Sequence, residues 1–325
     1  MSVSKRQLIF SLAGLLLVLC LLDRAVAWMA RESYPRRLMS RLRETPGAQV
    51  LALGNSVIGT GIVEASLDES LGLGRENGTI NLGMGASWPV EHLLMLRYAL
   101  GHGLRPRVVV YGFYDFQLTH PVELATRDLI GNNAMLYYVE PEYARTFYRL
   151  SLHDRIEFQI MRYFEIFADR GAVWLDVERW RRAISQQGMP PEKTSALGRA
   201  NDFTLLEYPS ASAFLEECGR ASQLDLIPPV REIVRQASSA GSRVVFVEMP
   251  MPPAHVHSFY DSAAWAGYEA HVRGLLDGLG VSYVDASHWM PEESSFEDPL
   301  HMTYEGAQRF SRRLGEYIRA APPTQ

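Results

Sequence analysis

The chain has 325 residues, 47% hydrophobic and 21% charged, which is typical of a globular protein with a sizeable core. The net charge of −5, without a dense Lys/Arg stripe and interleaved aromatic residues, gives no reason to expect a nucleic-acid partner. The two cysteines lack metal-type spacing. Because Cys20 lies in an N-terminal apolar run, we expect one thiol, Cys218, and no disulfide in the folded domain. An oxidising compartment is not excluded.

The N-terminus has the order of a secretory signal. Basic residues at 5–6 precede an apolar run, 8–22, and an Ala-x-Ala sequence at 25–27. The run is shorter than the ~20 residues that span a bilayer comfortably. Extension to Trp28 would carry Asp23 and Arg24 to the interface, where arginine can snorkel. An uncleaved anchor, a cleaved signal and a buried helix remain open; we expect the anchor, with the following domain extracytoplasmic, on the periplasmic or cell-surface side, or secreted if the signal is cleaved.

The domain organisation follows from changes in composition along the chain. Residues 1–30 are the anchor or signal segment, and the arginine-rich residues 31–46 are a juxtamembrane linker that ends at Pro46-Gly47. Residues 47–320 form one domain. Within it, residues 117–222 are rich in aromatic residues and arginine and have helical patterns. We expect a helical insertion there, acting either as a lid or acceptor-binding wall or as a cover for one face of the sheet.

Short apolar runs separated by helical patterns predict an α/β fold. The runs are predicted to be parallel strands, because they lack polar alternation and several end in glycine-rich loops. They lie at residues 49–53, 79–82, 107–111, 243–248 and 281–285. The expected architecture is a three-layer αβα sandwich around a five-stranded, mostly parallel sheet.

Ser56 is the candidate nucleophile, because it follows the first predicted strand, where such sheets place their ligands. A serine hydroxyl needs a base, usually histidine, and the histidine needs a group that fixes its tautomer. Asp298 and His301 lie three residues apart in a late loop and suit these two roles. A serine after Gly-Asn is also a common helix N-cap, and from the tripeptide alone we would favour that interpretation.

In combination, these segments resemble the SGNH (GDSL-type) hydrolase superfamily over roughly 48–115 and 228–320. The matching blocks are Leu53-Gly54-Asn55-Ser56, the glycine loop at 81–87, and Asp298-Pro-Leu-His301 with Gly306 five residues on. The resemblance implies the flavodoxin-like fold of that superfamily, with Ser56 as nucleophile, His301 as general base and Asp298 as the orienting acid.

The resemblance also implies donors for the oxyanion of the acyl intermediate. Gly85 or Gly83 would supply one, together with the backbone N–H of Ser56. The third block departs from the family pattern, since Tyr114 stands before Asp115 where the family has asparagine. Tyr114 and Asp115 remain oxyanion or substrate-binding candidates.

The N-terminal anchor and the large insertion resemble the membrane-anchored branch of the superfamily, which includes the D-alanyl transfer protein of teichoic acids and alginate O-acetylation proteins. This implies an extracytoplasmic serine-dependent acyltransferase or esterase of O-acetyl type, acting on a cell-envelope polysaccharide without a cofactor. Its partners would be the polysaccharide or an acyl donor, the membrane through the N-terminal segment, and optionally a membrane-bound O-acyltransferase. The alternative is a catalytically inactive envelope protein that binds glycan or a membrane partner, for which Tyr114 is the main support.

His255 and His257 follow the fourth predicted strand with His-x-His spacing. Without nearby acidic or cysteine ligands they make a weak metal site, so we predict no metal and give His255 a substrate-groove role instead.

Overall fold

A computed structural model describes residues 4–74, 78–85, 87–120, 140–147, 151–171, 173–174 and 210–320. The chain divides into two compact units, each described by itself below. Unit 1 comprises Met1–Ser40 and Glu123–Pro190, and unit 2 comprises Arg41–Val122 and Pro191–Gln325.

Unit 2 contains a five-stranded sheet in the order β2-β1-β3-β4-β5, with every pair of neighbours parallel. The strands are β1 (Val50–Leu53), β2 (Thr79–Asn81), β3 (Val108–Phe113), β4 (Arg243–Glu248) and β5 (Ser282–Asp285). β1 and β2 are buried throughout, and β3 and β4 everywhere except at their first residue, as expected for parallel strands covered on both faces. The predicted five-stranded α/β architecture is confirmed, and strand pairing is entirely parallel.

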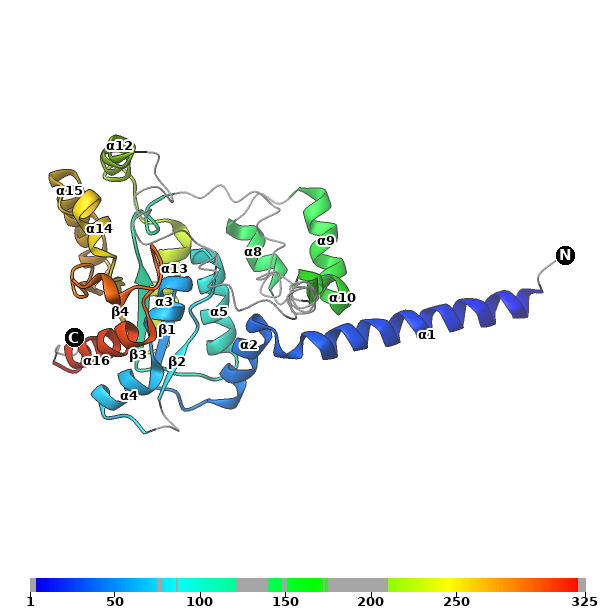
Figure 1. Ribbon diagram of the computed structural model, residues 1–325. Helices are drawn as coiled ribbons and strands as arrows, with labels where there is room; N and C mark the ends of the chain where they lie inside the picture. Colours follow the sequence, from blue (N-terminus) through cyan, green and yellow to red (C-terminus); the bar gives the residue numbers. More distant parts are fainter. Residues whose placement is uncertain are drawn as a thin grey trace, which may run out of the picture. The chain divides into compact units, whose positions relative to one another are not determined.

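Helices cover both faces of this sheet. α4 and α16 pack together on one side, and α5 and α13 pack together on the other (Figure 1). The helices of unit 2 are α3 (Ser56–Gly61), α4 (Glu64–Leu71), α5 (Pro89–Gly101), α12 (Ala211–Ala221), α13 (Pro228–Ser239), α14 (Pro253–His255), α15 (Ala263–Asp277) and α16 (Tyr304–Ala320), with short helical turns η4 (Val256–Tyr260) and η5 (Glu293–Ser295). Because the helices cover the faces of the sheet, the carboxyl ends of its strands are bordered by loops.

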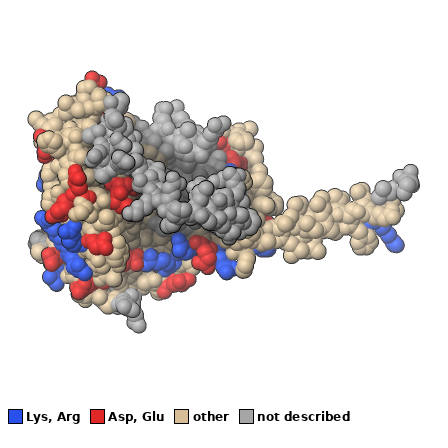
Figure 2. Space-filling view, in the orientation of Figure 1, with Lys and Arg blue, Asp and Glu red and all other residues tan. Residues whose placement is uncertain are grey.

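Unit 1 contains the N-terminal helix and three described helices of the predicted insertion, whereas α12, which also lies within the predicted bounds of 117–222, belongs to unit 2. Its elements are α1 (Lys5–Met29), η1 (Ala30–Glu32), the first part of α2 (Tyr34–Glu44), α8 (Pro141–Phe147), α9 (Leu152–Tyr163) and α10 (Glu165–Ala168). By length and composition, residues 5–32 can cross a membrane. Figure 2 shows α1 with almost no charged side chains beyond the basic pair near its N-terminus.

Two helix starts near the site have a local cause. The chain after Ser56 forms two helices, α3 and α4, separated by residues 62–63. The N-cap of α5 is Trp88, and the hydroxyl of the preceding Ser87 donates to the carbonyl of Met84.

Candidate active site

Ser56 is the first residue of α3, directly beyond the carboxyl end of β1. Asn55 is the N-cap of this helix, and its side chain accepts a hydrogen bond from the backbone N–H of Val57 at 2.9 Å. The hydroxyl of Ser56 is therefore not needed as a cap. Gly54 allows β1 to turn close to β3, because a Cβ atom at this position would lie 2.6 Å from the carbonyl oxygen of Gly112.

The structure brings the three predicted catalytic side chains into one hydrogen-bonded chain. Nε2 of His301 lies 2.8 Å from Oγ of Ser56, across 245 residues of sequence. Nδ1 of His301 lies 2.7 Å and 2.9 Å from the two carboxylate oxygens of Asp298. With the Nδ1 proton donated to Asp298, Nε2 is left to accept the proton of the Ser56 hydroxyl. The arrangement suits nucleophilic catalysis.

The Asp298 carboxylate is held by its own loop. Oδ1 accepts hydrogen bonds from the backbone N–H groups of Leu300 and His301, at 2.8 Å and 2.9 Å. Desolvation, the largest single influence, raises the pKa of Asp298, but these hydrogen bonds and the His301 ring together outweigh it and hold the pKa below its usual value. Asp298 is therefore ionised at neutral pH, as an orienting acid must be.

Helix α16 joins the two halves of the site. The hydroxyl of Ser311 on this helix accepts a hydrogen bond from the backbone N–H of Val63, just beyond α3, at 2.8 Å. Gly306, the last residue of the Asp-x-x-His block, packs against the backbone of Ser295, whose carbonyl oxygen would lie 2.4 Å from a Cβ atom there. The motif glycine thus supports the loop that carries Asp298 and His301.

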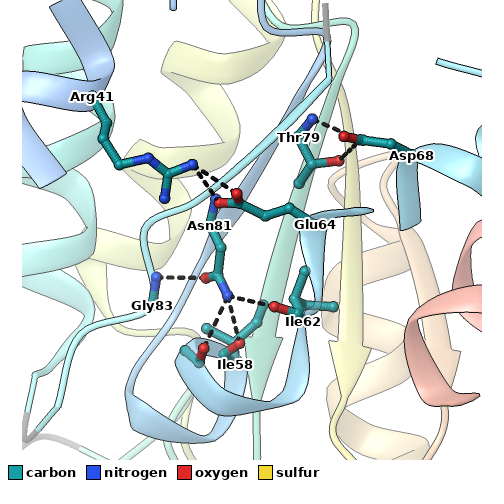
Figure 3. A network of polar contacts seen from close by, with 9 residues as sticks. Arg41, Ile58, Ile62, Glu64, Asp68, Thr79, Asn81 and Gly83 are labelled. Carbon is teal, nitrogen blue, oxygen red and sulfur yellow. Dashed lines mark hydrogen bonds and ion pairs between the residues drawn. The ribbon is translucent and has the colours of Figure 1, made fainter. Parts of the chain in front are cut away.

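Asn81 fixes the helix that carries Ser56 (Figure 3). Its Nδ2 donates to the carbonyl oxygens of Ile58, Gly59 and Ile62, at 3.0–3.1 Å. Its Oδ1 accepts the backbone N–H of Gly83 at 2.9 Å. One amide side chain therefore connects the end of α3 to the glycine loop after β2.

The same network continues to α4 (Figure 3). Oε1 of Glu64 accepts from the backbone N–H of Asn81 at 2.7 Å, and Arg41 donates to both oxygens of the Glu64 carboxylate. Asp68 accepts from the backbone and hydroxyl of Thr79. These contacts join α4 to β2 and so hold in place the strand from which the glycine loop begins.

The two predicted glycine donors have different surroundings. The N–H of Gly83 already donates to Asn81, and its Cα packs against Gly59, whose nitrogen would lie 2.2 Å from a Cβ atom. Gly83 therefore serves close packing, whereas Gly85 is exposed in the same loop. Between the two, this favours Gly85 as the oxyanion donor.

Tyr114 and Asp115 follow β3, and neither side chain is open to solvent. Tyr114 is 6% exposed and Asp115 is 3% exposed. The backbone N–H of Tyr114 donates to Oε1 of Gln117 at 3.4 Å. An oxyanion contact from Tyr114 stays a prediction.

His255 pairs with Asp115 in the interior. Nε2 of His255 lies 3.1 Å from Oδ1 of Asp115, and the hydroxyl of Tyr260 donates to the same oxygen at 2.7 Å. Direct substrate binding by His255 and Asp115, as predicted from their strand-end positions, does not fit this arrangement, because both side chains are buried and occupied with each other. They connect the loops after β3 and β4 instead.

A second buried histidine lies beneath the glycine loop. His92 on α5 has Nε2 2.8 Å from the hydroxyl of Ser87 and Nδ1 2.9 Å from the hydroxyl of Tyr111. Because Ser87 donates its own proton to Met84, His92 donates from Nε2 and accepts at Nδ1. Burial lowers the pKa of His92 to about 3, so the ring is neutral.

Sequence reasoning missed several of these supporting residues. Asn81 and Ser87 lie inside the recognised glycine block, but their partners are distant in sequence and no local pattern names them. The signal for His92 was a lone histidine among the apolar residues of α5, a pattern that indicates a satisfied buried histidine. Among the described residues, no group of three or more His, Cys, Asp or Glu side chains could hold a metal ion.

Comparisons with known proteins give distant similarities. A protein-family model matches residues 224–321, less than half of the chain. No curated protein matches the chain. Similar solved structures include a GDSL-like lipase from Bacteroides thetaiotaomicron (10% identity, 88% of this chain and 98% of that chain, TM-score 0.38). A second example is a lipase/acylhydrolase from Enterococcus faecalis, with 12% identity, coverage of 86% of this chain and 98% of that chain, and a TM-score of 0.39. A third is a carbohydrate acetylesterase from Sinorhizobium meliloti, with 12% identity, coverage of 84% and 99%, and a TM-score of 0.36. At these identities and TM-scores the similarities carry no argument about activity.

Proposed function

We propose that this protein is a serine-dependent esterase or acyltransferase that works through an acyl-Ser56 intermediate. The observation that carries the proposal is the continuous chain from the Ser56 hydroxyl through His301 to Asp298, with contacts of 2.8 Å and 2.7 Å. The buried Ser87–His92 pair has the same distance, but only the Ser56 chain ends in a carboxylate, and only there are the serine and histidine partly exposed.

The chemistry follows from the proton positions. As the Ser56 oxygen attacks an acyl carbonyl carbon, Nε2 of His301 takes the hydroxyl proton, and Asp298 stabilises the imidazolium. His301 then returns the proton to the departing alkoxide, which leaves an acyl ester on Ser56. A second hydroxyl, from water or from an acceptor, attacks this ester with His301 again as the base. Water gives an esterase, and an acceptor hydroxyl gives a transferase.

The negative oxygen of each tetrahedral intermediate needs hydrogen-bond donors. The backbone N–H of Ser56 is in the first turn of α3, where helix N–H groups lack an intrahelical partner and favour negative charge. The exposed position of Gly85 supports it as the second donor. Tyr114 would be the third, in place of the usual asparagine.

The proposed substrate is an O-acetylated cell-envelope polysaccharide, with the domain anchored outside the cytoplasm by α1. The resemblance to the membrane-anchored branch supports this, and so does the apolar exposed surface of α1. A membrane-bound O-acyltransferase would then be a natural acyl donor for the transferase reaction.

An uncleaved anchor has a specific structural support. Cleavage after the Ala-x-Ala sequence at 25–27 would remove Asp23 and Arg24. The Asp23 carboxylate is buried and accepts the backbone N–H of Ile166 at 2.9 Å, and Arg24 forms an ion pair with Glu165. The helix α1 also runs unbroken through the cleavage sequence. Intact-mass measurement of the membrane-extracted protein would show whether residues 1–27 are retained.

The experiment that tests catalysis uses the full chain in nanodiscs with p-nitrophenyl acetate. We expect p-nitrophenol release that Ser56→Ala abolishes, while Thr60→Ala, a matched change one turn further along α3, retains most of the rate. Equal rates for Ser56→Ala and the parent chain would remove Ser56 from the mechanism. Adding a soluble oligosaccharide acceptor then separates the two reactions, because only a transferase produces acetylated oligosaccharide.

The alternative, an inactive protein that binds glycan, draws on Tyr114 in the third block. It would have gained support if the His301 ring were beyond hydrogen-bond reach of Ser56. The 2.8 Å contact favours catalysis instead.

A further inference from the structure

We propose that the exposed apolar side chains of α9 and α10 rest on the lipid bilayer that α1 enters, so that unit 1 contacts the membrane at a second place. The occupant of this surface is the headgroup and upper acyl region of a bilayer containing anionic lipid. The inference rests on the proposal that α1 is a membrane anchor, and its test separates the two.

Helix α10 is attached to α1 at the level where the apolar run of α1 ends. Asp23 is the first charged residue after this run, and its carboxylate accepts the backbone N–H of Ile166 at 2.9 Å. Arg24 lies 3.0 Å from Glu165 of α10. If residues 8–22 lie in the hydrocarbon, α10 is held at the bilayer surface.

A second ion pair network fixes α10 from the other side. Arg36 of α2 donates to Oδ1 and Oδ2 of Asp169, at 3.0 Å and 2.5 Å, and to Glu165 at 2.6 Å. Asp169 is buried, so this two-point contact is protected from solvent. Asp23 and Arg24 of α1 and Arg36 of α2 therefore hold α10 next to the end of the apolar run of α1.

Helix α9 presents an apolar stripe. Leu152, Ile156 and Tyr163 are 74%, 53% and 68% exposed. At about 100° per residue these three positions fall within about 40° of one another around the helix axis. The opposite face of α9 is buried, with Phe158 and Met161 inside unit 1. The stripe is thus a face of an amphipathic helix that the described residues leave uncovered.

The segment after α9 extends the same kind of surface. Phe164, Ile166 and Phe167 are 48%, 39% and 45% exposed. Three large apolar side chains are thus exposed within four residues, and the element that carries them is attached at the end of the proposed membrane-crossing helix. This combination is typical of a segment at the membrane interface. Trp28 of α1 is also exposed, with the guanidinium of Arg31 4.2 Å from its ring centroid, a pairing suited to the lipid–water interface.

Charge supports a bilayer as the occupant. Arg155 and Arg162 are exposed and fall about 80–100° to one side of the stripe centre, where they can reach anionic headgroups while the stripe faces the acyl chains. Helix α10, which carries part of this apolar surface, is bonded to α1. When α1 is inserted in a bilayer, the surface therefore lies close to that bilayer.

The test attaches an environment-sensitive fluorophore to single cysteines in the full chain, with Cys20→Ala as background and Cys218 left buried. The probes are Ile156→Cys and Phe167→Cys on the surface, Leu15→Cys in α1 as the inserted reference, and Ser238→Cys, an exposed polar position of α13, as the reference outside any apolar face. The chain is reconstituted in phosphatidylcholine/phosphatidylglycerol nanodiscs, with and without brominated acyl chains. Circular dichroism confirms that each exposed substitution leaves the fold intact.

We expect brominated lipid to quench the Ile156→Cys and Phe167→Cys labels at least twofold more than the Ser238→Cys label. Quenching at the Ser238→Cys level, with the Leu15→Cys label quenched, would overturn the surface contact while keeping the anchor. Labels shielded from aqueous iodide but not quenched by brominated lipid would assign the surface to a protein, including a second copy of this chain, and would also overturn the proposal. An unquenched Leu15→Cys label would overturn the anchor and this inference together, without touching the Ser56 chemistry.

Discussion

Nε2 of His255 lies 3.1 Å from Oδ1 of Asp115, although the two residues follow different strands. The hydroxyl of Tyr260 donates to the same carboxylate and also receives the backbone N–H of Asp115 at 3.1 Å. Burial, reinforced by the charge of Asp115, raises the pKa of Tyr260 well above its ordinary value, so the hydroxyl keeps its proton. The loops after β3 and β4 are therefore joined by a buried network.

Replacement of His255 tests whether this histidine supports the fold or binds substrate. We expect His255→Ala to reduce the free energy of unfolding by about 1–3 kcal/mol, because a buried carboxylate loses a donor. His255→Gln, which can still donate, should lose less. The KM for p-nitrophenyl acetate should stay within about twofold of the parent value. A large rise in KM without a change in thermal stability would restore the substrate-binding role predicted from the sequence.

Replacement of Asp298 tests the orienting role of its carboxylate. Asp298→Asn should lower kcat for ester hydrolysis by on the order of 10³–10⁴-fold, because the amide no longer stabilises the imidazolium or fixes the productive tautomer. Glu297→Gln, at the exposed neighbouring position, is the matched control and should leave kcat unchanged. Similar kcat values for the two variants would argue against a catalytic carboxylate in this loop.

Replacement of Asn81 tests the connection between α3 and the glycine loop. In Asn81→Asp a carboxylate would face the carbonyl oxygens of Ile58, Gly59 and Ile62, so we expect a loss of about 2 kcal/mol or more in stability. Asn81→Ala removes the donors without adding a charge and should lose less. Thermal unfolding gives the ranking, and kcat should fall in parallel because α3 carries Ser56. Equal stability of Asn81→Asp and the parent chain would contradict this role.

The buried His92 predicts a pH dependence of stability. Its folded-state pKa is lowered to about 3, whereas the unfolded chain protonates near its ordinary value of about 6.5. Between these values the unfolded state binds more protons, so stability falls as pH falls, by up to about 1.4 kcal/mol per pH unit. His92→Gln can donate to Ser87 and accept from Tyr111 without titrating. Its midpoint of thermal unfolding should therefore drop less than that of the parent between pH 7 and pH 4.5; parallel curves would refute the assignment.

The buried Glu248 predicts the opposite sign. Desolvation raises the pKa of Glu248 well above its ordinary value, with the charges of Asp285 and Glu269 adding to it, and Oε1 has no hydrogen-bond partner among the described residues. A raised folded-state pKa means that stability is lost as pH rises above about 4.5 toward that value. Glu248→Gln keeps an acceptor for Tyr283, so it should be more stable than the parent at pH 8, and this gain should shrink at pH 5. Thermal unfolding at both values checks the difference.

The amino-acid sequence alone predicted the layered fold, which the structure confirms, and the three side chains that we propose as the reacting groups. The apolar runs of β1, β3 and β4 are local and continuous, and a parallel sheet collects the loops that follow its strands at one edge. Ser56 therefore had a predictable position, and Asp298 and His301 lie close enough in sequence to form their pair within one loop. Local chemistry was sufficient in both cases.

Only the tertiary structure showed which polar residues line the candidate active site and which are buried and stabilise the fold. Asn55 and Ser56 are both able to cap a helix, and the backbone path after Gly54 assigns the cap to Asn55. Asp115 and His255 looked equally suited to a substrate groove, but they are 140 residues apart, and only folding shows that they are buried against each other. A residue's type records what it can bond to, whereas burial and the partner it meets depend on contacts between distant segments, which no local pattern specifies.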